Sequence, residues 1–126
     1  MKSQENGKHP IHIDFDADRW RRVEQNYVDW WAGKLERPLI AVTLGGYETV
    51  MPPPALPIHR FASFYGLETP AEQIVDTWQW TLEGQRYLGD AFPSVSPNFG
   101  PGVIAAFLGC ELHASIEGDT TWFHPA

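Results

Sequence analysis

An apolar run that follows a helical pattern constrains the fold of this chain more than any other feature. Residues 38–44 read Pro-Leu-Ile-Ala-Val-Thr-Leu, and two glycines follow them. A nearly continuous apolar run of strand length is typical of a strand that is covered on both faces in a parallel sheet, whereas strands of an antiparallel sandwich alternate apolar and polar residues. We therefore expect an interior strand with parallel neighbours, within an α/β fold.

A helix is expected before this strand. Its apolar residues recur at three- and four-residue spacing: Trp20, Val23, Tyr27, Trp30 and Trp31. This spacing places them on one face, so we expect the tryptophans to be buried. Asp16 or Asp18 can cap the helix, which should run to about Ala32, and Gly33 supplies the stop.

Prolines dominate the stretch that follows the strand. Four of them lie within residues 52–57. Because proline fixes φ and lacks a backbone donor, residues 47–57 cannot form a helix or a central strand. We expect a stiff surface connection, and the alternative is a polyproline ligand for a partner domain.

The clearest local signal in the sequence is a helix start at residues 69–72. Thr69 offers a capping hydroxyl, Pro70 suits the first helical position, and Glu72 follows three residues after the cap. The helix should end near Gly89. Residues 91–96 can then form a second short strand, followed by a glycine-rich turn, a short helix at 103–108 and a hairpin of residues 112–116 and 120–123.

Three segments taken together resemble the N-terminal part of uncharacterised proteins in the uroporphyrinogen decarboxylase-like superfamily, which also holds corrinoid-dependent methyltransferases. They are residues 20–33, which begin Trp-Arg-Arg-Val-Glu-Gln-Asn-Tyr; Arg-Pro-Leu-Ile at 37–40; and Asn-Phe-Gly-Pro-Gly-Val-Ile-Ala-Ala-Phe-Leu-Gly at 98–109. The closing Thr-Trp-Phe at 121–123 extends the resemblance over nearly the whole chain.

The resemblance implies the N-terminal portion of a (β/α)₈ barrel, with a leading helix, the first one or two strand-helix units and a C-terminal hairpin. A complete barrel needs about 250 residues, and this chain has 126. We therefore expect residues 1–126 to form a single, incomplete domain with a disordered tail at 1–10, inactive alone. In a completed barrel, the activity would be that of a decarboxylase (a lyase) or a methyltransferase-like enzyme.

The chain departs from the superfamily in its chemistry. The arginine-rich motif that holds substrate carboxylates in uroporphyrinogen decarboxylases is missing, because Arg60 and Arg86 are isolated. The zinc ligands of the methyltransferase relatives belong to the later part of the barrel. The sequence therefore predicts no metal ligands, and the cofactor stays unknown.

Two positions are expected at the ligand-binding end of the strands, where barrels bind their ligands. Thr43 and Gly45 end the first strand. The stronger candidate is the turn that contains Asn98, Phe99, Gly100 and Gly102, because a helix N-terminus leaves amide donors unpaired and suits an anion. The sequence thus predicts a small anionic substrate there, although both positions are also ordinary turns.

The other polar clusters favour structural roles. Strand alternation would put Glu111 and His113 on one face and Cys110 on the other, so the three cannot converge on a metal. The aspartates at positions 14, 16 and 18 are better explained as helix caps than as a cation site. Trp80 and Trp122 are the two indoles left as possible exposed platforms for a sugar.

Charge and composition limit the partners. Nine Lys and Arg stand against sixteen Asp and Glu, for a net charge of −7, which disfavours nucleic acid and anionic membranes. A single cysteine and the lack of an apolar run of membrane-spanning length favour a cytoplasmic protein. The alternative to a barrel segment is a non-catalytic interaction module that uses the Pro-rich loop or a sheet edge, and exposed edges can also support self-association.

Overall fold

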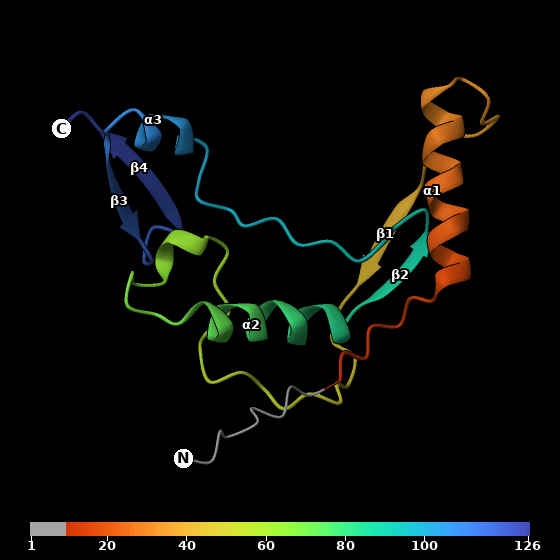
Figure 1. Ribbon diagram of the computed structural model, residues 1–126, viewed down its shortest axis with the longest axis horizontal. Coiled ribbons are helices and arrows are strands. Elements are labelled where there is room, and N and C mark those ends of the chain that lie inside the picture. The colour runs from red at the N-terminus through yellow and green to blue at the C-terminus, as the bar shows by residue number, and fades with distance from the viewer. Residues whose placement is uncertain (1–9) are drawn as a thin grey trace, which may run out of the picture. The chain divides into compact units, whose positions relative to one another are not determined.

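The computed structural model describes residues 10–126, and they divide into two compact units. Unit 1 comprises the described residues up to Pro53 together with Gln79–Ser94, and unit 2 comprises Pro54–Trp78 with Val95–Ala126. Figure 1 labels the α-helices and strands of both. The predicted disordered tail lies outside the described residues, except for Pro10.

Unit 1 contains helix α1 (Ala17–Trp31), strand β1 (Ala41–Leu44), strand β2 (Arg86–Gly89) and the end of helix α2 (Ala71–Glu83). The ends of α1 follow the sequence prediction. Asp16 caps the helix, since its side chain accepts a hydrogen bond from the backbone N–H of Arg19 at 2.8 Å. Gly33, with φ of 68°, stops it.

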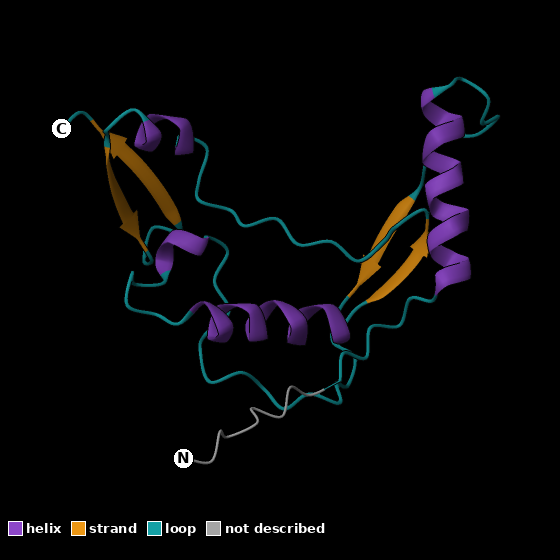
Figure 2. Cartoon of the chain, viewed as in Figure 1, coloured by secondary structure: helices purple, strands orange, loops and turns teal. Residues whose placement is uncertain are grey.

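The sheet of unit 1 corrects the predicted fold class. β1 pairs with β2 in antiparallel register, with Ala41 opposite Gly89 and Leu44 opposite Arg86. The described residues form two separate two-stranded antiparallel sheets (Figure 2), and none of them forms part of a parallel barrel. The prediction of an N-terminal barrel portion is therefore wrong, although the chain is a mixed α/β protein.

The antiparallel pair is closed at one end by a tight backbone contact. The backbone N–H of Asp90 donates to the carbonyl oxygen of Ile40 at 2.7 Å. Gly89, with φ of 64°, lets the chain turn there, and a Cβ at this position would overlap the same carbonyl oxygen. The glycine that was predicted to end a helix therefore ends a strand.

The apolar run at 38–44 also differs from its predicted burial. Only its last four residues form a strand, and all four are exposed; the side chain of Val42 is 41% exposed. An apolar run indicates that burial of its side chains is favourable, but among the described residues no segment buries the side chains of β1. The interior position predicted for this strand is wrong.

The region from 84 to 96 differs from the sequence prediction as well. α2 ends at Glu83 rather than near Gly89, and β2 occupies residues that were expected to be helical. Tyr87 explains the strand, because its ring is buried and its hydroxyl donates to the carbonyl oxygen of Leu82 at 3.1 Å. Residues 91–96, predicted as a strand, have no regular structure.

Unit 2 contains the short 3-10 helix η1 (Ala62–Phe64), the first part of α2, helix α3 (Val103–Phe107) and strands β3 (Glu111–Ser115) and β4 (Thr120–His124). β3 and β4 form the predicted antiparallel hairpin. The predicted short helix and the loop character of residues 47–57 are confirmed too. Glycines or prolines lie within or close to each of these segments, as Gly109 does after α3 and Gly118 does between β3 and β4, and such residues are strong local signals.

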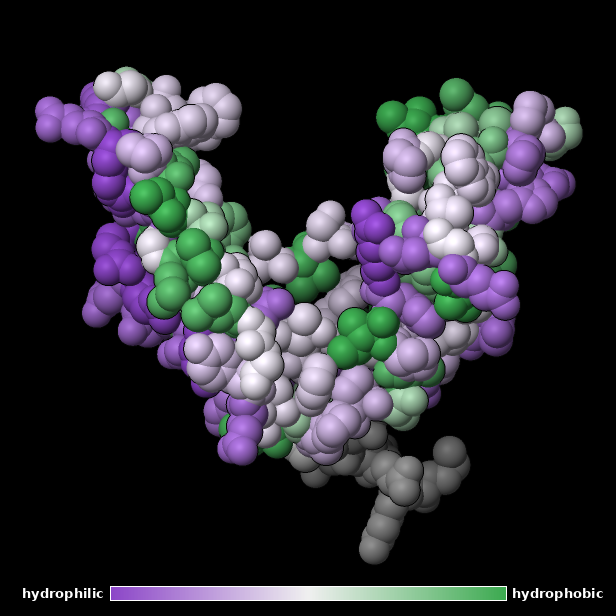
Figure 3. All heavy atoms as spheres, turned by 180° about the vertical axis from the view of Figure 1, so that it is seen from behind, coloured by the Kyte–Doolittle hydropathy of each residue, from purple (hydrophilic) through white to green (hydrophobic). Residues whose placement is uncertain are grey.

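The core of the described chain is small. Its buried apolar side chains are Val23, Met51, Tyr87 and Ala91 in unit 1, and Phe61 in unit 2. Many large apolar side chains stay at the surface, and Figure 3 shows hydrophobic residues on the outside of the molecule. Trp20, Trp30 and Trp31 are among these exposed residues, so their predicted burial is wrong.

Candidate functional site

The predicted ligand turn lies in unit 2, and the oxygens of Asn98 accept hydrogen bonds within that unit. The side-chain oxygen of Asn98 accepts a hydrogen bond from the backbone N–H of Gly100 at 3.0 Å. The carbonyl oxygen of Asn98 accepts another from the backbone N–H of Ala62 at 2.6 Å. Asn98 therefore shapes the turn and ties it to the start of η1. Phe99 is exposed beside it.

The two glycines of this turn lie against β4. A Cβ on Gly100 would overlap the hydroxyl of Thr121, and one on Gly102 would overlap the ring of Phe123. Close packing therefore accounts for both glycines without a ligand. The following helix, α3, has only five residues and no side-chain cap. An anion-binding role for this turn stays a prediction from the sequence.

Thr43 and Gly45, the other predicted positions, lie in unit 1. Thr43 is an exposed residue of β1 and pairs with Tyr87 across the sheet. Gly45 follows the strand in open surroundings, since an added Cβ would meet nothing within 4 Å. The two predicted positions thus belong to different units, and their ligand-binding role stays a prediction.

The described residues contain no group of three or more His, Cys, Asp or Glu side chains that could hold a metal ion. Glu111 and His113 share a face of β3, with 3.7 Å between carboxylate oxygen and ring nitrogen. Asp14 lies 3.1 Å from the guanidinium of Arg86, and Asp18 pairs with Arg21. These carboxylates therefore take part in caps and ion pairs.

Asp90 is the most engaged polar side chain of unit 1. Its buried carboxylate accepts two hydrogen bonds from the guanidinium of Arg37, at 2.6 and 2.8 Å. It accepts two more, from the side chain of Asn26 at 2.8 Å and the backbone N–H of Ile40 at 2.9 Å. With both oxygens occupied, Asp90 is a structural anchor rather than a free base.

The pKa values of two buried carboxyls follow from these surroundings. The hydrogen bonds from Arg37 lower the pKa of Asp90 far below its usual range, and they outweigh the opposite effect of burial. At Glu83, burial is the largest influence and raises the pKa. However, hydrogen bonds from the backbone N–H groups of Met51 and His12 leave the pKa of Glu83 below its ordinary value.

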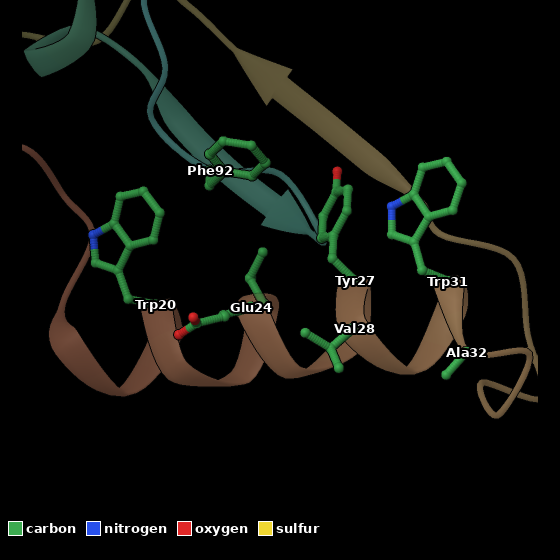
Figure 4. Close-up of a pocket in the computed structure, with 8 residues that line it drawn as sticks. Trp20, Glu24, Tyr27, Val28, Trp31, Ala32 and Phe92 are labelled. Carbon is green, nitrogen blue, oxygen red and sulfur yellow. The ribbon is translucent and has the colours of Figure 1, made fainter.

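The strongest candidate site is an apolar groove along α1, with a volume of about 770 Å³. We call it the α1 groove, and Figure 4 shows the residues that line it. They come from α1, from Ala32 after it and from the segment after β2: Trp20, Val23, Glu24, Tyr27, Val28, Trp31, Ala32 and Phe92.

Ring contacts fix the geometry of this groove. The ring of Phe92 lies 5.8 Å from that of Trp20 and 5.6 Å from that of Tyr27, measured between centroids. Phe92 thus wedges between two α1 side chains that are seven residues apart. Trp31 extends the row and is 79% exposed. Such an arrangement offers flat apolar faces to a binding partner.

Sequence reasoning missed the α1 groove, although it found the residues of α1 that line it. The three- and four-residue spacing of Trp20, Tyr27 and Trp31 predicts a buried stripe. The same spacing arises when a partner outside the described chain covers the face. Neither Phe92 nor Glu24 carried a signal of its own in the sequence.

A second cavity of about 460 Å³ lies beside Asp90, and the other residues that line it are Arg22, Asn26, Arg37, Ile40 and Gly89. Within the described residues, none of the helices is long and apolar enough to cross a membrane.

No family model, no curated protein and no solved structure matches the chain. The resemblance to the uroporphyrinogen decarboxylase-like superfamily therefore stays a prediction from the sequence.

Proposed function

We propose that this chain is a non-catalytic interaction module that binds a polypeptide through the α1 groove. The observation that carries the proposal is the row of aromatic side chains left at the surface of a well-capped helix. Trp20 is 44% exposed and Trp31 is 79% exposed, and both line the same groove. Contiguous apolar surface rimmed by polar residues is typical of protein interaction sites.

The residue types also favour a polypeptide partner. Tryptophan and tyrosine are enriched among the residues that dominate binding energy at interfaces. Together with two valines, they occupy positions 20, 23, 27, 28 and 31 of α1, which follow the pattern by which one helix face packs into another apolar surface. Truncation of an aromatic residue that dominates an interface typically costs about 2 kcal/mol or more of binding energy, and Trp31 is the most exposed tryptophan of the groove.

The interaction surfaces predicted from sequence have less support. In the Pro-rich loop, Met51 is buried and its backbone N–H donates to Glu83 at 3.1 Å. Further along, the carbonyl oxygen of Pro57 accepts from the hydroxyl of Tyr65 at 2.9 Å. Each part of the loop is thus held by its own unit. Self-association through strand edges stays a prediction, and we treat it as a competing outcome.

We also propose a cytoplasmic location, which the single cysteine favours. The small anionic ligand at residues 98–102 is not needed by the proposed interaction. A decarboxylase or methyltransferase activity was expected only for a completed barrel, and we do not carry it forward, because the described residues form no barrel portion.

A binding experiment tests the proposal. A 14-residue amphipathic peptide of Leu and Lys, labelled with a fluorophore, is titrated with the full chain, and anisotropy gives the Kd. Trp31→Ala should weaken binding at least about tenfold, because it removes a large apolar contact. The matched control is Trp122→Ala, since Trp122 is 64% exposed on β4, outside the groove. Equal affinities for the two variants would contradict the proposal.

A further inference from the structure

A carboxylate lies within the α1 groove. Glu24 is exposed and forms no hydrogen bond or ion pair among the described residues. Its neighbours at helical spacing are Trp20 four residues before and Val28 four residues after, so it stands between apolar side chains. Arg21, three residues before, is the nearest cation along the helix face, and it already pairs with Asp18.

This carboxylate restricts what can fill the groove. A purely apolar occupant would remove water from Glu24 and supply nothing in its place, which opposes binding. An occupant with a Lys or Arg at that point would neutralise the carboxylate. The same cation would also be attracted by the ring faces of Trp20 and Tyr27, because the electrostatic potential over the face of an aromatic ring is negative.

The charge of the whole chain acts in the same direction. The net charge is −7, and such a surface attracts a basic partner and repels an acidic one. The long-range attraction and the neutralisation of the Glu24 carboxylate therefore both favour a partner segment with Lys or Arg interspersed among apolar residues.

The groove also restricts the backbone of its occupant. Six of its eight lining residues belong to α1, whose backbone groups bond within the helix, and the other two are Ala32 and Phe92, so the described lining offers no row of free N–H and C=O groups. An extended segment would leave its own backbone polar groups unpaired against aromatic rings. A helix satisfies these groups internally, and residues 20–32 span roughly 18 Å, the length of about three helical turns.

We propose that the α1 groove binds a basic amphipathic helix of a partner protein, with a Lys or Arg of that helix paired to Glu24. This inference rests on the proposed function and deepens it, because it specifies the chemistry and the conformation of the polypeptide that binds. The apolar face of the partner helix contacts Trp20, Tyr27, Trp31 and Phe92, and its basic residue lies among them.

The test uses three peptides with the same Leu positions, in which all other positions are Lys, Gln or Glu. Each is titrated with the full chain and with three variants. Glu24→Gln removes the charge in the groove, and Glu117→Gln removes an equal charge from an exposed position in unit 2. Trp31→Ala reports whether a peptide occupies the groove at all.

We expect the Lys peptide to bind at least about tenfold more tightly than the Glu peptide. Glu24→Gln should weaken the Lys peptide about three- to tenfold and leave the Gln peptide unchanged or tighter. Glu117→Gln should change the Lys peptide less than twofold. Circular dichroism should show that the Lys peptide becomes helical at saturation.

Three results would overturn the inference. Equal effects of Glu24→Gln and Glu117→Gln would show that only the general charge attracts the peptide. Equal affinity for the three peptides, still sensitive to Trp31→Ala, would leave the groove as a binding site but remove the basic partner. A bound peptide that stays unfolded would exclude the helix. Binding insensitive to Trp31→Ala would instead overturn the proposed function itself.

Discussion

At Asp90, four hydrogen bonds from three parts of unit 1 meet on one buried carboxylate. The donors are Asn26 of α1, Arg37 of the connection after α1, and the backbone N–H of Ile40 just before β1. Because a buried carboxylate is stable only when its oxygens are paired, these bonds fix the start of β1 against the end of β2 and against α1.

The first stability prediction concerns this residue. Asp90→Asn should lower the free energy of unfolding by about 2 kcal/mol, because an amide cannot accept all four hydrogen bonds that the buried carboxylate accepts, while the half-exposed Arg37 can still be solvated. Urea denaturation at pH 7 measures the loss. A change below about 1 kcal/mol would show that the hydrogen bonds of the Asp90 carboxylate contribute little to the stability of unit 1.

The pH dependence of the same residue follows from the lowered pKa of Asp90. The carboxylate stabilises the fold above its unfolded pKa, about 3.9, and that stabilisation is lost as the pH falls towards the much lower folded pKa. Between pH 5 and strongly acid solution, the stability of the chain should therefore fall more steeply than that of Asp90→Asn. Parallel curves would contradict this assignment.

On the scale of elements, most of what the sequence predicted correctly was local. The capping side chain of Asp16 and the stop at Gly33 bound α1, and the turn at 116–119 joins β3 to β4. Each of these depends on groups within a few residues of one another, so the sequence contains the whole signal.

What the sequence mispredicted depends on contacts between distant segments. The direction of β1 relative to β2 is set by pairing across more than 40 positions, and the turn at Gly89 against Ile40 decides where it closes. The early end of α2 has the same origin. The carbonyl oxygen of Gly84 accepts a hydrogen bond from the backbone N–H of Tyr47 at 3.1 Å. A local sequence pattern cannot predict that bond, because its partners are far apart in the chain.

The packing of the 98–102 turn on β4 gives a prediction at this scale. Gly100→Ala should lower the free energy of unfolding by about 2–3 kcal/mol, since the new Cβ meets Thr121 in addition to the strain of a φ of 97°. Gly109→Ala is the matched control, because Gly109 has a φ of 98° and an added Cβ would meet nothing within 4 Å.

The control should lose only about 1 kcal/mol, the cost of the left-handed backbone alone. The difference between the two variants in thermal or urea denaturation isolates the contact with Thr121. If Gly100→Ala is no worse than Gly109→Ala, the glycine serves something other than packing, and the ligand site predicted there regains support.

At the scale of the whole molecule, the described chain leaves much apolar surface uncovered. Val42 and Leu88 on the first sheet, and Phe107 and Leu108 on and just after α3, are exposed as well as the residues of the α1 groove. The sequence could not reveal this, because helical spacing and apolar runs indicate that a face needs cover but not which polypeptide provides it.

Binding of a polypeptide in the α1 groove can be tested directly by NMR. The indole N–H signals of the tryptophans are recorded while the full chain is titrated with the Leu/Lys peptide. Trp20 and Trp31 line the groove, whereas Trp122 lies on β4. We expect the signals of Trp20 and Trp31 to shift in a saturable way with one Kd, and the signal of Trp122 to stay in place. A saturable shift of Trp122 with Trp20 and Trp31 unchanged would contradict binding in the α1 groove.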